Sequence, residues 1–150
     1  MTNEHIITKD IIKNTEKIKF YYDNESKIKE IILNNGERYI KEFTDYNLDI
    51  IVIEILSKDK IDEGYFLLLC IDYMFNYEGL INKEITVIQY PRGKLSYSNG
   101  IIKEIKNNEI THLASTEPGS SGSPIFIKDT IKVIGIHKSG TVDNKKNYAD

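Results

Sequence analysis

The run Gly119-Ser120-Ser121-Gly122-Ser123-Pro124 leads directly into the apolar segment Ile125–Ile127. A serine flanked by glycines, such as Ser121, can occupy a tight turn with its hydroxyl exposed and backbone N–H groups converging beside it. Attack by serine on a carbonyl carbon needs that geometry, because the oxyanion that forms must meet donors already in place. A flexible Gly/Ser linker is the other interpretation, but linkers are not normally bounded by an apolar strand and closed by a proline. The run therefore predicts a nucleophile at Ser121, with the N–H groups of Gly119 and Ser121 as the oxyanion hole.

Two upstream segments supply a base and a carboxylate in the chain order His, Asp, Ser. His5 lies in Met1–Ile7, and Asp49 opens the apolar segment Leu48–Ile55. In a triad, His5 would take the proton from Ser121 and Asp49 would hold the imidazole in the useful tautomer. Asp45 competes with Asp49 for the orienting role.

Longer stretches on either side of the serine carry a family resemblance. The chain reads THLASTEPGSSGSPIF from Thr111 and KVIGIHKSG from Lys132 to Gly140, and EITVIQYPRGK begins at Glu84. These stretches resemble the signature of glutamyl endopeptidases and their trypsin-like relatives, closely over residues 84–140 and more thinly around His5 and Asp49. The resemblance implies a serine-type endopeptidase that acts on peptide or protein substrates.

The same resemblance implies a specificity pocket. Thr116 would lie on its wall and His137 would project into it, while Lys138, Ser139 and Gly140 would pair with the substrate backbone. A hydroxyl and an imidazole suit a carboxylate, so we expect cleavage after glutamate, with aspartate second. Ser115 stands where trypsin carries its pocket aspartate, so cleavage after Lys or Arg is not expected. Glu117 could face the pocket and repel an acidic side chain.

Short Ile- and Tyr-rich runs separated by Asn, Gly and Asp predict an all-β protein. We expect strands at Lys17–Tyr22, Lys29–Leu33, Arg38–Phe43, Asp49–Leu56, Glu84–Tyr90, Gly100–Lys106, Glu109–Ala114, Ser123–Lys128 and Ile131–His137. Asn34-Asn35-Gly36 predicts a hairpin turn. A helical turn is possible at 6–13, and helix could also form at 6–18 and 60–75.

The resemblance implies a chymotrypsin-like double β-barrel, with residues 1–56 as a partial first barrel, 57–83 as a connector and 84–150 as the second barrel. Only four residues precede His5, and the chain ends at Asp150. We therefore expect the first barrel to be incomplete at its N-terminus, and the last strand and the helix after it to be missing at the C-terminus. Such a chain should be poorly stable.

Composition and motifs exclude other classes of function. A net charge of −3 with interspersed signs favours neither nucleic acid nor membrane partners. An α/β-hydrolase elbow needs glycine where Ser123 stands. No phosphate loop or metal motif occurs, so we expect no cofactor and no metal. The single cysteine, Cys70, lies in an apolar run and is interpreted as a core residue. We expect a monomer. The N-terminus shows no signal peptide, and the compartment stays undetermined.

Two other hypotheses remain. The chain could be a catalytically inactive, protease-like peptide-binding module or gene fragment. Alternatively, it could be a structural β-domain in which the Gly/Ser run is only a turn; convergence of His5, Asp49 and Ser121 would argue against that interpretation.

Overall fold

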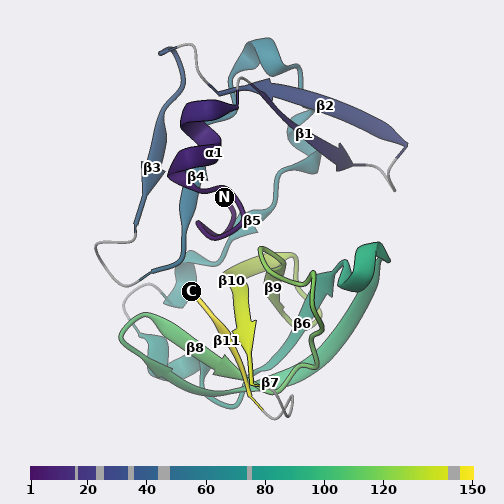
Figure 1. The fold of residues 1–150 in the computed structure, drawn as a ribbon. Coiled ribbons are helices and arrows are strands. Elements are labelled where there is room, and N and C mark those ends of the chain that lie inside the picture. The colour runs from purple at the N-terminus through teal and green to yellow at the C-terminus, as the bar shows by residue number, and fades with distance from the viewer. Residues whose placement is uncertain (16, 23–25, 34–35, 44–47, 74–75, 142–145) are drawn as a thin grey trace.

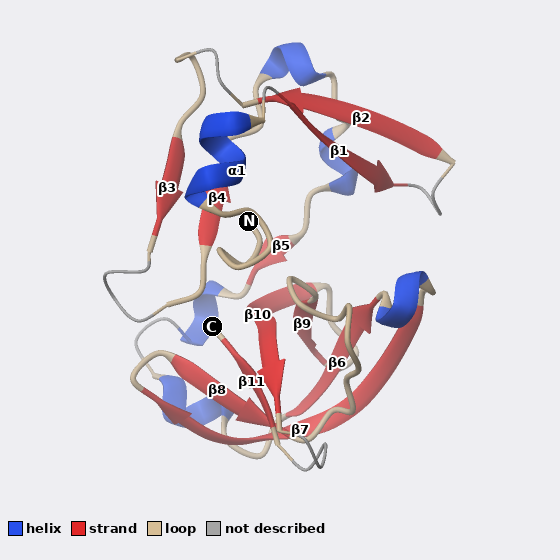
Figure 2. Ribbon diagram, in the orientation of Figure 1, coloured by secondary structure: helices blue, strands red, loops and turns tan. Residues whose placement is uncertain are grey.

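The structure is a computed structural model that describes residues 1–15, 17–22, 26–33, 36–43, 48–73, 76–141 and 146–150. Figure 1 shows an N-terminal half (purple to blue) stacked on a C-terminal half (green to yellow), and strands dominate both halves in Figure 2. The strands are β1 (Lys17–Tyr22), β2 (Lys27–Ile32), β3 (Ile40–Glu42), β4 (Ile51–Ile53), β5 (Leu68–Leu69), β6 (Glu84–Gln89), β7 (Ser96–Lys106), β8 (Glu109–His112), β9 (Pro124–Ile127), β10 (Lys132–Gly140) and β11 (Asn147–Ala149). The helices are α1 (Lys9–Asn14) and the 3₁₀ helices η2 (Ser57–Asp59), η3 (Glu63–Tyr65), η4 (Ile71–Tyr73), η5 (Tyr77–Leu80) and η6 (Pro91–Gly93).

The C-terminal half is a closed barrel of six strands. They pair in the order β11-β8-β7-β6-β9-β10, and β10 pairs with β11 to close the ring. Alternate residues of β6 point inward, so Ile85 and Val87 are fully buried against Ile102 and Ile125. Gly100 sits where β7 bends around the barrel, and a Cβ there would lie 2.2 Å from the backbone nitrogen of Ala114. Only glycine permits that close approach.

The N-terminal half is more open. β1 pairs with β2 and β3 pairs with β4, in two separate two-stranded sheets. The chain start joins β4 through a bridge between Thr2 and Ile51, and Ile51 is fully buried. α1 follows, and the side chain of Thr8 caps it by accepting a hydrogen bond from the Ile11 N–H at 3.3 Å.

The segment between the halves contributes one strand to the barrel sheet. β5 pairs in parallel with β10 through Lys132 and Val133. The next residue, Cys70, is half-buried and donates its backbone N–H to the Val133 carbonyl at 2.8 Å. This segment therefore lies along the barrel wall.

Each of the nine predicted strand regions overlaps an observed strand, β1–β4 and β6–β10. The predicted all-β class is confirmed, and α1 lies within the helix considered at 6–18. Asn34, Asn35 and the rival carboxylate Asp45 lie outside the described residues.

Two expectations are wrong. The last strand of the second barrel is not missing, because β11 pairs with both β8 and β10. The described part of 60–75 is not an α-helix but contains η3, β5 and η4. There the Asp62 carboxylate caps the start of the short helix η3 by accepting the Gly64 N–H at 2.8 Å. The edge of β10 then pairs with Leu68 and Leu69 as a strand.

Candidate active site

Ser121 lies on a glycine-framed turn between β8 and β9. Gly119 and Gly122 adopt positive φ angles of +96° and +81°, which glycine reaches without steric cost. The turn is fixed to β10, since Gly122 donates its N–H to the His137 carbonyl at 2.8 Å and His137 donates to the Ser123 carbonyl at 2.8 Å. The barrel wall therefore holds the serine turn in place.

The neighbouring serines have structural roles. Ser120 is 1% exposed, and its hydroxyl accepts the Glu117 N–H at 3.3 Å. Ser123 is also buried. Ser121 is the partly exposed serine of the turn, as the motif predicts for a nucleophile.

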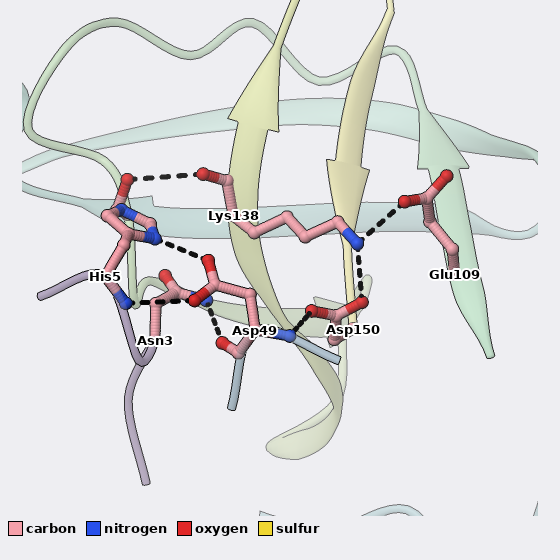
Figure 3. A network of polar contacts seen from close by, with 7 residues as sticks. Asn3, His5, Asp49, Glu109, Lys138 and Asp150 are labelled. Carbon is pink, nitrogen blue, oxygen red and sulfur yellow. Dashed lines mark hydrogen bonds and ion pairs between the residues drawn. The ribbon is translucent and has the colours of Figure 1, made fainter. Parts of the chain in front are cut away.

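His5 and Asp49 are joined at two points. The Asp49 carboxylate accepts the His5 backbone N–H at 3.0 Å through one oxygen, and its other oxygen contacts His5 Nδ1. A carboxylate can only accept, so Nδ1 carries the proton and Nε2 is left as an acceptor. Asp49 is held in turn by Asn3, a buried residue that donates its side-chain amide to the Asp49 carbonyl at 3.0 Å. Figure 3 shows this cluster beside β10.

The segment that carries His5 lies against the serine turn. Thr2 Oγ1 is 2.8 Å from the position that a Cβ on Gly122 would occupy. His5 is also close enough to His137, which lines the pocket beside Ser121, to contribute to the lowered pKa of that imidazole. The structure thus brings the three predicted triad residues to one region, which argues against a plain structural turn.

The Ser121 hydroxyl is not engaged with His5. It donates instead to the Lys138 carbonyl at 3.3 Å. The N–H groups of Gly119 and Ser121 donate to no group among the residues that the structure describes. Two backbone donors at this turn are therefore available to a ligand, and the hydroxyl becomes available once it leaves the Lys138 carbonyl.

A pocket of about 380 Å³ adjoins the serine turn. It is lined by Thr116, Glu117, Pro118, Gly119, Ser121, His137, Ser139, Gly140 and Thr141. Four of the predicted substrate-binding residues thus line it, and Lys138 contributes its carbonyl beside Ser121. The Lys138 side chain instead reaches Asp150 and Glu109.

Two residues of the pocket region escaped the sequence interpretation. The Thr116 hydroxyl donates to the side chain of Asn147 at 2.6 Å, and Asn147 donates to the Ala114 carbonyl at 2.8 Å. The expected hydroxyl donor is therefore occupied. His112 lies edge-on to His137, with ring centroids 5.6 Å apart. A lone histidine in a strand gives no signal in the sequence that its ring will lie edge-on to a histidine that lines a pocket.

Burial is the main cause of the lowered pKa values of His112 and His137. Desolvation, with a contribution from His137, lowers the pKa of His112 to about 4. Desolvation, with a contribution from His5, also lowers the pKa of His137 to about 4, although a backbone hydrogen bond with Tyr148 opposes the shift. His137 Nδ1 has no partner within the described part of the chain. Both imidazoles are thus neutral near pH 7.

Glu117, which could have repelled an acidic substrate, contacts Arg92 at 3.2 Å. Both side chains are largely exposed, so the pair weakens the negative charge only modestly. Within the described ranges, no group of three His, Cys, Asp or Glu side chains is placed to hold a metal ion. Those ranges also contain no helix with the length and apolar character needed to cross a membrane.

Comparison with known proteins gives consistent results. The family model of the trypsin-like peptidase domain matches residues 1–136. A glutamyl endopeptidase from Staphylococcus epidermidis is 42% identical over 76 residues, which cover 48% of this chain and 26% of that protein. One from Staphylococcus aureus strain MW2 is 40% identical over 78 residues, covering 49% and 23%. The match thus spans about a quarter of these curated relatives.

Solved structures share the fold at low identity. The serine endoprotease from Yersinia pestis superposes with a TM-score of 0.68 at 19% identity, covering 99% of this chain and 47% of that chain. An inactive form of the Rv3671c protease from M. tuberculosis gives 0.62 at 16%, covering 99% and 68%. The expected chymotrypsin-like architecture is confirmed. Since the family model spans most of the chain and its serine turn, histidine and aspartate lie together, the chain belongs to the trypsin-like peptidase family.

Proposed function

We propose that the chain is a serine endopeptidase that hydrolyses peptide bonds through an acyl-enzyme. The observation that carries the proposal is the two-point contact of Asp49 with His5, beside a turn that presents Ser121 with two available N–H groups. A structural turn would need none of these groups to converge. A hydrolase needs all of them.

The residues act in sequence in the proposed reaction. The Ser121 hydroxyl turns from the Lys138 carbonyl to His5 Nε2 and gives up its proton as Oγ bonds to the substrate carbonyl carbon. The Gly119 and Ser121 N–H groups bind the oxyanion. His5 then protonates the leaving amine as the C–N bond breaks, and it later activates the water that hydrolyses the acyl-enzyme. Asp49 keeps the proton on Nδ1 throughout.

Glutamate, then aspartate, is the proposed residue at the cleaved position. His137 lines the pocket together with Ser139, Gly140 and Thr141, and its ring would turn its one N–H from the Tyr148 backbone to the substrate carboxylate. The expected Thr116 donor is occupied by Asn147, so His137 carries most of the proposed preference. The curated relatives are named glutamyl endopeptidases, which agrees with this assignment.

Covalent labelling tests the reaction. The protein is treated with a fluorophosphonate, and mass spectrometry locates the adduct. We expect one adduct, on Ser121, and none in Ser121→Ala. In a second experiment, the unlabelled protein digests a peptide library. We expect cuts after Glu. Cuts mainly after Lys, Arg or Phe would overturn the specificity.

A peptide-binding module without catalysis is the second candidate. It is favoured by one observation, the hydrogen bond of Ser121 to Lys138 instead of His5. This candidate predicts that glutamate-containing peptides bind, as measured by calorimetry, while the fluorophosphonate leaves Ser121 unmodified.

A further inference from the structure

We propose that Asp150 is a positioning residue for the catalytic carboxylate: its buried side chain holds the backbone of Asp49 against the closed barrel, and Lys138 balances its charge. The inference rests on the proposed function in one respect, that Asp49 orients His5. Asp150 itself touches neither His5 nor Ser121 in any described contact.

Asp49 is fixed by three sets of contacts, and two of them come from its own half. Its carbonyl accepts from the Asn3 side chain at 3.0 Å and from the Glu4 N–H at 3.3 Å. Its carboxylate holds His5. Its backbone N–H donates to Asp150 Oδ2 at 2.8 Å, across the junction of the two halves. Among the described residues, this is the hydrogen bond that ties Asp49 to the barrel.

The Asp150 carboxylate is built into its place. Its side chain is 0% exposed, and its other oxygen accepts from Lys138 Nζ at 2.8 Å. Its backbone N–H and carbonyl pair with Ile136 of β10 at 3.1 and 2.8 Å. A buried carboxylate is costly unless it is paired and hydrogen-bonded. Both conditions are met here, and the carboxylate cannot move without breaking them.

Lys138 supplies the compensating charge. Its side chain is 15% exposed and also contacts Glu109 at 2.7 Å. Burial lowers the pKa of Lys138, but the hydrogen bonds and charges of Asp150 and Glu109 outweigh burial and leave that pKa raised. The ammonium group therefore stays charged at neutral pH, between the two carboxylates seen in Figure 3.

The same lysine connects this cluster to the nucleophile. Its carbonyl accepts the Ser121 hydroxyl, while its ammonium group holds Asp150, which holds the Asp49 backbone. Lys138 of β10 thus links Ser121 on the closed barrel to Asp49 on the open half. A shift of Asp49 by about 1 Å would misalign His5, and misplacements of that size cost about 10²-fold in rate.

The test compares two Asp150 variants with a matched control. Asp150→Ala removes the acceptor, and Asp150→Asn keeps one acceptor but cannot satisfy both Asp49 and Lys138. Asp72→Asn is the control, because Asp72 also pairs with a lysine of β10. That lysine is Lys132, and the pair is exposed. Each variant is measured for kcat and KM on a glutamyl peptide, for the fluorophosphonate labelling rate, for thermal unfolding, and for the proton NMR signal of His5 Nδ1–H.

We expect Asp150→Ala to lower kcat and the labelling rate by about 10²-fold with KM within about twofold, because alignment and not binding is lost. Asp150→Asn should lose less, and Asp72→Asn should match the parent. The downfield Nδ1–H signal should weaken in both Asp150 variants. If Asp150→Ala does not unfold cooperatively, Asp150→Asn decides.

Unchanged kcat and an unchanged Nδ1–H signal in a folded Asp150 variant would overturn the inference. An equal fall of kcat in Asp72→Asn would do the same, since it would reveal a general loss of stability. If the parent protein is never labelled, the proposed function fails, but the NMR comparison still decides whether Asp150 positions Asp49.

Discussion

The two halves of the molecule differ in how their strands close. The C-terminal half is a sealed ring of six strands around a continuous core, whereas the described strands of the N-terminal half form two separate pairs. The serine turn and the pocket belong to the ring, while His5 and Asp49 belong to the open half. In the proposed reaction, substrate recognition would therefore use the more constrained half, and proton transfer would depend on how the open half packs against it.

The largest test of this division is the removal of the base. His5→Ala should lower kcat by about 10⁴–10⁶-fold, because an unassisted serine hydroxyl is a poor nucleophile. Peptide affinity, measured by calorimetry, should stay within about twofold, since the pocket lies on the ring. Ser121→Ala is the control with the same profile. A large loss of affinity in His5→Ala would break the division between binding and proton transfer.

Replacement of the proposed orienting carboxylate, Asp49, tests the same division between binding and proton transfer more closely. Asp49→Asn should lower kcat by about 10⁴-fold, because an amide at this position favours the wrong imidazole tautomer. Steady-state kinetics measure the effect, with Asp45→Asn as the control that should keep near-parental activity. The reverse ranking would move the orienting role to Asp45.

Stability should also divide between the halves. Arg38, in the open half, pairs with Asp59 at 2.8 Å while both side chains are buried, and this pairing lowers the pKa of Asp59. Arg38→Met leaves Asp59 buried without its partner and should destabilise that half by about 3–5 kcal/mol. Urea unfolding should then become biphasic, with the ring unfolding at the parental midpoint.

The exposed pair Lys58–Glu37 provides the comparison. Lys58→Met should cost less than about 1 kcal/mol. One cooperative transition that shifts as a whole in Arg38→Met would show that the halves unfold together.

The preference for glutamate should change only when residues of the closed barrel are replaced. His137→Ala should reduce kcat/KM for glutamyl peptides by about 10²-fold, because one hydrogen-bond donor to a buried carboxylate is lost. Labelling of Ser121 by the fluorophosphonate, which does not use the pocket donor, should change much less. Equal losses in both assays would mean that His137 supports the turn and not the specificity.

The last prediction concerns the pH dependence of stability. His112 and His137 have pKa values lowered to about 4 in the folded protein. The unfolded chain therefore takes up protons first as the pH falls below about 6.5, and stability that is complete above that pH is lost progressively until about 4. At pH 5 the loss should be about 2 kcal/mol for each histidine. Urea unfolding from pH 7.5 to 4.5 measures it, and His112→Gln should reduce the slope by about half.

The sequence allowed the local features to be predicted, and the features set by distant contacts were missed. Ser121 stood out because its glycines are adjacent in the chain. The contact of His112 with His137 and the hydrogen bond of Asn147 with Thr116 join residues that are distant in the chain and meet only in the closed barrel. β11 was overlooked because Asn147–Ala149 is short and becomes a strand only between β8 and β10.

The error at 60–75 has a related cause. Its isoleucine and lysine residues are compatible with a helix, but the edge of β10 pairs with Leu68 and Leu69 as a strand. Tertiary pairing overrides such local propensity. Asp150 looked like an ordinary acidic residue, since nothing in its neighbours foretells complete burial.

The thiol of Cys70 can report on the connecting segment through the rate of its chemical modification. It is the one cysteine in the sequence, it is half-buried, and its backbone bond to Val133 fastens the connecting segment to the barrel wall. The rate at which a thiol reagent modifies Cys70 should therefore rise when that segment separates from the barrel wall. Every molecule carries one such thiol, and the signal comes from a single site without any engineering.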